Sequence, residues 1–139
     1  MEVDKVYPPI SVEILNGYLI SENIVEIDNT PFFIQGIAVG YKIFCESFGD
    51  SINYRYLSLK SSSGRGSVSI IFVEPDSSEE VYQRIRAMGL YSEYGEFPEY
   101  NMLAVSAHNL SEFEILTSYL SVEEAKGRVS YAELCLPDT

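Results

Sequence analysis

The chain has 139 residues, of which 46% are hydrophobic and 22% charged, a composition typical of one globular domain rather than of a disordered chain. Its 21 acidic and nine basic side chains give a net charge of −12 and a pI near 4.3. Such a charge repels nucleic-acid phosphates and anionic lipid, so we expect the protein to bind neither. No stretch approaches the roughly 18 apolar residues of a membrane span, and MEVDKVYPPI lacks the basic start and apolar run of a signal peptide. We therefore expect a cytoplasmic protein.

The first part of the chain, residues 1–67, has the pattern of an antiparallel β-rich unit. Asn16-Gly17 is typical of a two-residue hairpin turn between SVEIL and YLISENIVEI. PFFIQGIAVG and YKIFCESFG predict further strands, and Gly49-Asp50 predicts another turn. INYRYLSL and SVSIIFVE are the next two strands, with SSSGRG as a flexible hairpin connection between them. We expect this part to form a small barrel or an extended sheet.

Residues 68–139 alternate strands with helical periodicity. After SVSIIFVE, a capping-box pattern at Ser77 and Glu80 predicts a helix that ends at Gly89. Its apolar face is formed by Val81, Ile85 and Met88. The YSEYGEFPEY region is then the next β element, and MLAVSA is a short strand after it.

A second helix is capped by Asn109 or Ser111 and ends at Gly127, and RVSYAELCL forms the last strand. Its apolar face is formed by Phe113, Leu116 and Leu120. The order β-α-β-β-α-β predicts a ferredoxin-like half, in which two helices cover one face of an antiparallel sheet. The N-terminal strands would cover the other face. The fold class is therefore α+β, and we expect residues 1–139 to form a single domain.

Few residues suit catalysis or metal binding. Cys45 and Cys135 have no second cysteine at metal-ligand spacing, so buried free thiols are the favoured interpretation. His108 is the single histidine and lies at the entrance to a helix, where a capping or solvent-facing role is favoured. A zinc site or a nucleophile-base pair would need remote partners for this histidine. We therefore expect no catalytic residues, no metal and no cofactor.

The SSSGRGS segment is an alternative ligand loop. Its backbone amides can cradle an anion, with Arg65 as a counter-charge between Ser63 and Ser67. It lacks the lysine and the following helix of a phosphate loop, so a plain connection between strands is favoured.

The stretch YSEYGEFPEY repeats an aromatic residue and a glutamate every three residues. Gly95 and Pro98 exclude a regular helix, and a period of three favours a strand-loop or polyproline-like backbone. In an extended three-fold turn the aromatics would lie on one edge and the glutamates on another. Phe97 and Tyr91 are the rings that we expect to cover the sheet. Exposed tyrosines beside carboxylates are typical of a binding hot spot for a basic partner. The predicted partner-binding residues are Tyr91, Glu93, Tyr94, Glu96, Glu99 and Tyr100.

The charge distribution supports a basic partner. No basic residue lies between Ala87 and Ala125, whereas seven glutamates do. A solubilising surface is the alternative interpretation of such a run.

Several motifs resemble those of a known family. They are DNTPFF at 28–33, GIAVG at 36–40, SGRGS at 63–67, and Gly127 followed by Tyr131 and Glu133. Together they resemble the bacterial family of domains of unknown function numbered four-two-six-five, over nearly the whole chain. Tyr41 stands where the family tends to have aspartate, and Arg65 and Gly66 replace a usual His-Ser pair. The resemblance implies no activity, although domains of this kind occur among bacterial toxin-immunity genes.

The favoured hypothesis is thus an acidic cytosolic binding protein of the immunity or antitoxin type. Its partner would be a basic protein such as a cognate toxin, and the chain would be a monomer or a weak homodimer. The alternative is a small-molecule or nucleotide-binding domain with a pocket near Ser63, Arg65, Asp28 and His108. A structural subunit of a larger assembly, with exposed strand edges, is a third hypothesis.

Overall fold

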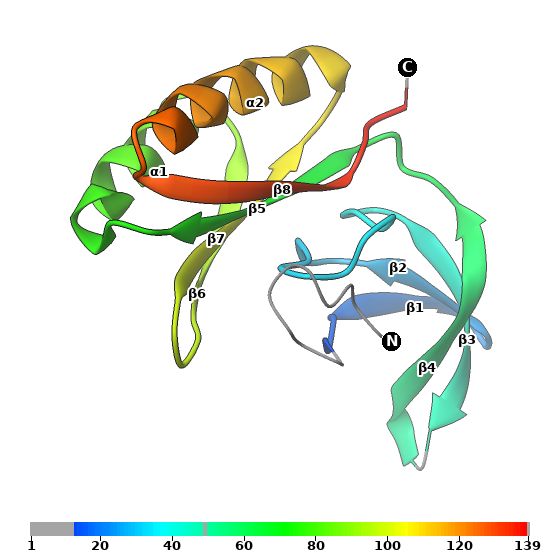
Figure 1. Cartoon of the computed structure of the whole chain (residues 1–139). Coiled ribbons are helices and arrows are strands. Elements are labelled where there is room, and N and C mark those ends of the chain that lie inside the picture. The colour runs from blue at the N-terminus through cyan, green and yellow to red at the C-terminus, as the bar shows by residue number, and fades with distance from the viewer. Residues whose placement is uncertain (1–12, 49, 139) are drawn as a thin grey trace.

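The computed structural model describes residues 13–48 and 50–138. Two sheets lie side by side, and both helices cover the second sheet (Figure 1). The elements in chain order are β1 (Gly17–Ser21), β2 (Ile24–Ile27), β3 (Lys42–Phe48), β4 (Asp50–Ser61), β5 (Gly66–Phe72), the 3-10 turn η1 (Pro75–Ser77), α1 (Ser78–Ala87), β6 (Tyr91–Glu96), β7 (Asn101–Ala107), α2 (Leu110–Ala125) and β8 (Val129–Cys135).

The sheet topology confirms the predicted α+β class. The first sheet has the strand order β1-β2-β3-β4, and the second has the order β6-β7-β5-β8. All pairings are antiparallel. The second order, with its two helical crossovers, is that of the predicted ferredoxin-like β-α-β-β-α-β half.

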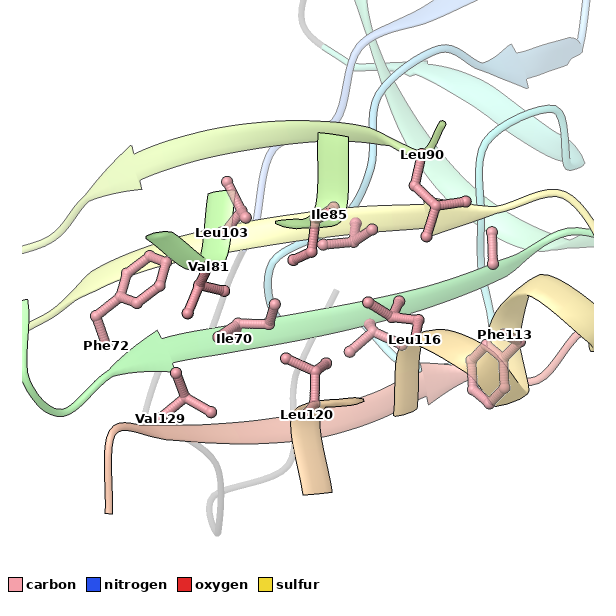
Figure 2. Close-up of a cluster of buried hydrophobic side chains, with 13 residues drawn as sticks. Ile70, Phe72, Val81, Ile85, Leu90, Leu103, Phe113, Leu116, Leu120 and Val129 are labelled. Atoms are coloured by element: carbon pink, nitrogen blue, oxygen red, sulfur yellow. The ribbon is translucent and has the colours of Figure 1, made fainter. Parts of the chain in front are cut away.

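The main core lies between the two helices and the second sheet, as Figure 2 shows. The helix faces predicted from periodicity are confirmed, and β5 alternates so that every second side chain points to the helices. The fully buried members of this core include Val68, Ile70, Val81, Ile85, Leu116 and Leu120. Both predicted helix stops are also confirmed, since Gly89 and Gly127 have φ of +80° and +76°.

Residues 28–41 form a layer between the sheets, which we call the inter-sheet segment. PFFIQGIAVG was predicted to be a strand, but the structure contains no strand here. Phe33 packs on Ile71 and Met102 of the second sheet, while Ile34 packs with the first sheet. Gly36 and Gly40 have φ of +80° and +84° and turn the segment. A regular strand cannot contain residues with such positive φ without a break.

The Asn16-Gly17 turn prediction was wrong. Gly17 opens β1, and the hairpin turn lies at Glu22-Asn23 instead. Gly17 lies opposite Ile27, and a Cβ atom there would be 2.4 Å from Val25 Cγ1. The glycine therefore serves close strand packing rather than a positive-φ turn. Residues 13–15 of the predicted SVEIL strand are irregular, and the rest of that strand lies outside the described residues, as does Gly49 of the second predicted turn.

Two further expectations need correction. SSSGRG is not a hairpin connection, because β4 and β5 belong to different sheets and the loop carries the chain from one to the other. The capping box at Ser77 is absent: α1 begins after a 3-10 turn, and the Ser77 hydroxyl donates to the carbonyl oxygen of Glu74 at 2.7 Å. The helix itself is confirmed.

Candidate functional site

The stretch YSEYGEFPEY forms strand β6 and the tight turn that leads into β7. The predicted strand with a loop is confirmed and the polyproline-like alternative was wrong, because six consecutive pairings with β7 impose the two-residue period of a strand. Tyr91 lies opposite Ser106, on the face toward the inter-sheet segment, and Tyr94 lies opposite Leu103, on the helix face. The two tyrosines therefore flank the outer edge of the sheet from opposite faces.

The hairpin exposes its tyrosines and packs its half-buried phenylalanine against the core. Tyr91, Tyr94 and Tyr100 are 56%, 52% and 39% exposed. Phe97 stacks edge-on with Phe32 and Phe33, at centroid distances of 5.4 and 5.1 Å. The expected core role of Phe97 is confirmed, whereas Tyr91 does not cover the sheet as expected.

The three glutamates of the hairpin have different surroundings. Glu93 is half-buried, and its Oε2 accepts the backbone N–H of Thr30 at 2.6 Å. This carboxylate therefore ties β6 to the inter-sheet segment. Glu96 and Glu99 are exposed and make no ion pair within the described part of the chain. Glu96 and Glu99 are thus the two carboxylates of the hairpin that a partner can reach.

The surroundings of Tyr91 raise the pKa of its hydroxyl. Desolvation raises the pKa of its hydroxyl, and the nearby charges of Glu93 and Asp28 raise it further. The hydroxyl therefore stays protonated and can donate a hydrogen bond to a partner.

A shallow groove of about 380 Å³ lies beside the hairpin turn. Val73 and Tyr100 are exposed in its wall, and Glu99 supplies its one charged side chain. The remaining wall is largely apolar and includes Pro75, Phe97 and Pro98. This composition suits a long side chain with an aliphatic stem and a cationic head.

Two arginines of the second half of the chain are engaged by residues outside the hairpin. Arg128 contacts Glu80 at 2.6 Å and Glu123 at 3.0 Å. Arg84 lies over the ring of Tyr119, at 5.1 Å from its centroid. Among the described residues, neither arginine forms an ion pair with a glutamate of the hairpin.

In the alternative ligand loop, residues 61–67, several polar groups form hydrogen bonds within the protein. The Ser63 hydroxyl donates to the carbonyl oxygen of Val39 at 2.6 Å and accepts the N–H of Arg65 at 3.3 Å. The N–H of Gly64 is bound to the Ser62 hydroxyl. Ser67 is fully buried in β5, whereas Ser63 is exposed in the loop. The structure therefore does not place these two serines at one accessible site. The backbone N–H groups of Gly64 and Arg65 are already hydrogen-bonded to serine hydroxyls. A ligand site at this loop remains a prediction.

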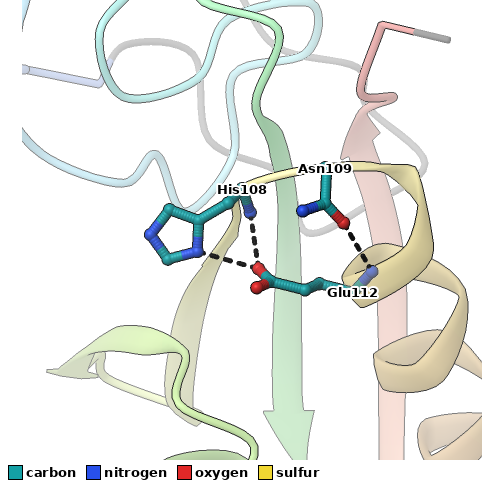
Figure 3. A network of polar contacts seen from close by, with 3 residues as sticks. All are labelled: His108, Asn109 and Glu112. Carbon is teal, nitrogen blue, oxygen red and sulfur yellow. Dashed lines mark hydrogen bonds and ion pairs between the residues drawn. The ribbon is translucent and has the colours of Figure 1, made fainter.

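His108 takes part in the cap of α2, as Figure 3 shows. The Asn109 side chain accepts the N–H of Glu112 at 2.9 Å, which confirms it as the predicted N-cap. Glu112 in return accepts the backbone N–H of His108 at 2.9 Å and lies 2.8 Å from its Nδ1. These contacts lower the pKa of Glu112, the backbone hydrogen bond contributing most. The expected capping role of His108 is confirmed.

Both cysteines are buried free thiols, as expected. Burial raises the pKa of each. Cys135 Sγ donates to the Tyr41 hydroxyl at 3.2 Å. Tyr41 thus completes an internal contact between the inter-sheet segment and β8.

Glu13 is a structural carboxylate that no sequence motif indicated. Glu13 accepts the backbone N–H groups of Phe32, Phe33 and Ile34, at 2.7, 3.1 and 3.0 Å. Three successive amides that converge on one anion form a nest. This contact joins residues about 20 apart in sequence and leaves no local pattern that could reveal it.

Within residues 13–48 and 50–138, no group of three or more His, Cys, Asp or Glu side chains is arranged to hold a metal ion. No helix of that part is long and apolar enough to cross a membrane.

Comparison with known proteins confirms the resemblance. The model of the family described as "Domain of unknown function (DUF4265)" matches residues 13–131, so the chain belongs to this family. It is also similar to a solved structure described as a novel crystal structure of a hypothetical protein from Neisseria gonorrhoeae. That match has a TM-score of 0.72 and 21% identity, and covers 91% of this chain and 85% of that chain. Such an identity shows a shared fold alone. No curated protein matches the sequence.

Proposed function

We propose that this member of the DUF4265 family is a protein-binding domain that takes a basic partner at its β6–β7 hairpin. One observation carries the proposal: Tyr91, Tyr94 and Tyr100 are exposed on the same hairpin as the exposed carboxylates of Glu96 and Glu99. Tyrosines are effective anchors because they bury a large area at little conformational cost and keep a polar tip.

The charge of the hairpin supports a basic partner. Its glutamates lie in a stretch without a basic residue, on a chain of net charge −12. Such a surface accelerates the approach of a basic protein and repels acidic ones, and salt weakens the effect. Binding should therefore weaken as ionic strength rises.

The more specific proposal is an immunity or antitoxin role. In this form the acidic hairpin would cover the cationic cleft of a toxin and exclude its substrate. The exposed tyrosines would fill the cleft while Glu96 and Glu99 pair with its lysines or arginines. A neighbouring gene for a basic effector domain would support this form.

The test is affinity capture at low salt from the native bacterium, followed by mass spectrometry. The informative variant is Glu96→Lys/Glu99→Lys, which leaves the structural Glu93 in place. The matched control, Glu22→Lys/Glu114→Lys, makes the same charge change at two exposed glutamates outside the hairpin.

A basic protein retained by the native chain and by the control, but lost from the hairpin variant, is the expected result. Equal recovery of the partner protein with both variants would mean that the interface does not lie at the hairpin. If the native chain retains no protein, the small-molecule alternative and the Ser63–Ser67 loop become the better hypothesis.

A further inference from the structure

Strand β6 is an edge strand whose outer backbone groups can be assigned. The N–H of Phe97 donates to the carbonyl of Tyr100 at 2.8 Å, so these two residues form a hydrogen-bonded pair next to the turn. Hydrogen-bonded and non-hydrogen-bonded pairs alternate along an antiparallel ladder. In the register of β6 with β7, the backbone groups of Ser92, Tyr94 and Glu96 therefore point away from β7.

The opposite edge of the same sheet is covered. On β8, Glu124 Oε2 accepts the N–H of Tyr131 at 3.3 Å, and the carbonyl of Leu134 accepts the N–H of Gly36 at 2.7 Å. Such cover is the usual protection of an edge strand. Among the described residues no comparable group binds the outer backbone of β6.

Charge distinguishes β6 from the two edges of the other sheet. Strand β1 carries no charged side chain, and β4 carries one acid, Asp50, with two cations, Arg55 and Lys60. Strand β6 carries Glu93 and Glu96 and no cation. A second copy joined through its own β6 would bring these carboxylates together, whereas a lysine-bearing strand would be attracted to them.

We propose that β6 accepts an extended, lysine- or arginine-bearing segment of the partner as a fifth strand of the second sheet. The added strand bonds to the outer N–H and C=O groups of Ser92, Tyr94 and Glu96. Its side chains lie beside Tyr94 on one face and Tyr91 on the other, and its cations pair with Glu96. This is β-strand addition, in which the main chain supplies affinity and alternate side chains supply specificity. It rests on the proposed function, for which it names the binding mode.

The probe is a short synthetic peptide of alternating lysine and valine, as long as the six residues of β6. Amide hydrogen exchange is followed by NMR at low salt. The expected result is slower exchange at the amides of Ser92, Tyr94 and Glu96, with little change at Glu93 and Gly95, whose amides already face β7. Peptides with alternating glutamate and valine, or with N-methylated alternate amides, should not bind.

A variant pair isolates the backbone contribution. Ser92→Pro removes one outward N–H at a position where an edge strand tolerates proline, and Ser92→Ala keeps it. We expect the Kd for the lysine-valine peptide to rise roughly tenfold in Ser92→Pro relative to Ser92→Ala, because a backbone hydrogen bond is lost and the proline ring blocks approach. Circular dichroism establishes that both variants fold. If Ser92→Pro does not fold, the alternate protection pattern in the native chain decides the question.

The proposal fails if the lysine-valine peptide does not bind, or if protection appears away from β6 or without alternation. It also fails if the N-methylated peptide binds equally well, or if the chain associates with itself through β6 instead. A captured basic partner lost on Glu96→Lys/Glu99→Lys, together with any of these outcomes, would uphold the proposed function and reject strand addition.

Discussion

Replacement of Glu13 by alanine tests the contact that holds the inter-sheet segment in place. The carboxylate accepts three backbone N–H groups within 2.7–3.1 Å, at residues 32–34. A hydrogen bond to a charged group contributes about 1.5–3 kcal/mol. The three bonds share one half-buried carboxylate, and water can reach part of the vacated site. We therefore expect Glu13→Ala to lower the free energy of unfolding by about 3 kcal/mol rather than by the full sum, and Glu13→Gln, which keeps one acceptor oxygen, by roughly half as much.

Equilibrium urea unfolding measures the effect. With a slope of about 1.5 kcal/mol per molar urea, the midpoint of Glu13→Ala should fall by about 2 M. Glu22→Ala, at an exposed glutamate in the β1–β2 turn, is the control and should leave the midpoint unchanged. If Glu13→Ala matched this control, the carboxylate would contribute nothing to the packing of Phe32 and Phe33 beneath β6, and the reasoning would be refuted.

Three further predictions concern packing and pH. Gly95→Val should lower the free energy of unfolding by roughly 1–3 kcal/mol and lower the thermal midpoint, because a Cβ atom at this position would lie 2.9 Å from Phe32 Cζ. An unchanged midpoint would mean that the Phe32 ring moves away without cost. Leu116→Ala should cost about 2–5 kcal/mol in urea unfolding, since the side chain is fully buried between α2 and the sheet. The pKa of Glu112 is lowered by its contacts with His108, so its contribution to stability is complete above its ordinary pKa of 4.5 and is lost as pH falls through the lower folded value. The stability difference between wild type and Glu112→Ala should therefore shrink below about pH 4.5, and a constant difference down to pH 2 would contradict this.

The C-terminal half was the more predictable part of the fold. The faces of both helices, the Asn109 cap and the glycine stops at Gly89 and Gly127 all depend on residues within a few turns of one another. Apolar spacing and backbone conformation are local properties, so they can be read from the chain directly. The order of elements then restricts the topology to the observed sheet.

The candidate site was predictable in composition but not in geometry. Exposed tyrosines and glutamates at YSEYGEFPEY were expected, and the structure exposes Tyr94 and Tyr100 there. It also exposes Tyr91, which was expected to cover the sheet. Their placement on two faces of an edge strand follows from pairing with β7, which overrides the apparent period of three. Glu93 differs from Glu96 and Glu99 because its carboxylate accepts the backbone N–H of Thr30, a residue 63 positions away in the sequence.

The sequence by itself determined the fold class, the two helices with their glycine stops, the Asn109 cap of α2, and the acidity of the hairpin. Only the tertiary structure decided that Gly17 packs within a strand, that residues 28–41 lie between two sheets, and that β6 is an edge. The reason is the range of the interactions. Helix periodicity acts over a few residues, whereas the Glu13 and Glu93 contacts, and the assignment of β4 and β5 to different sheets, depend on segments brought together only when the whole chain packs.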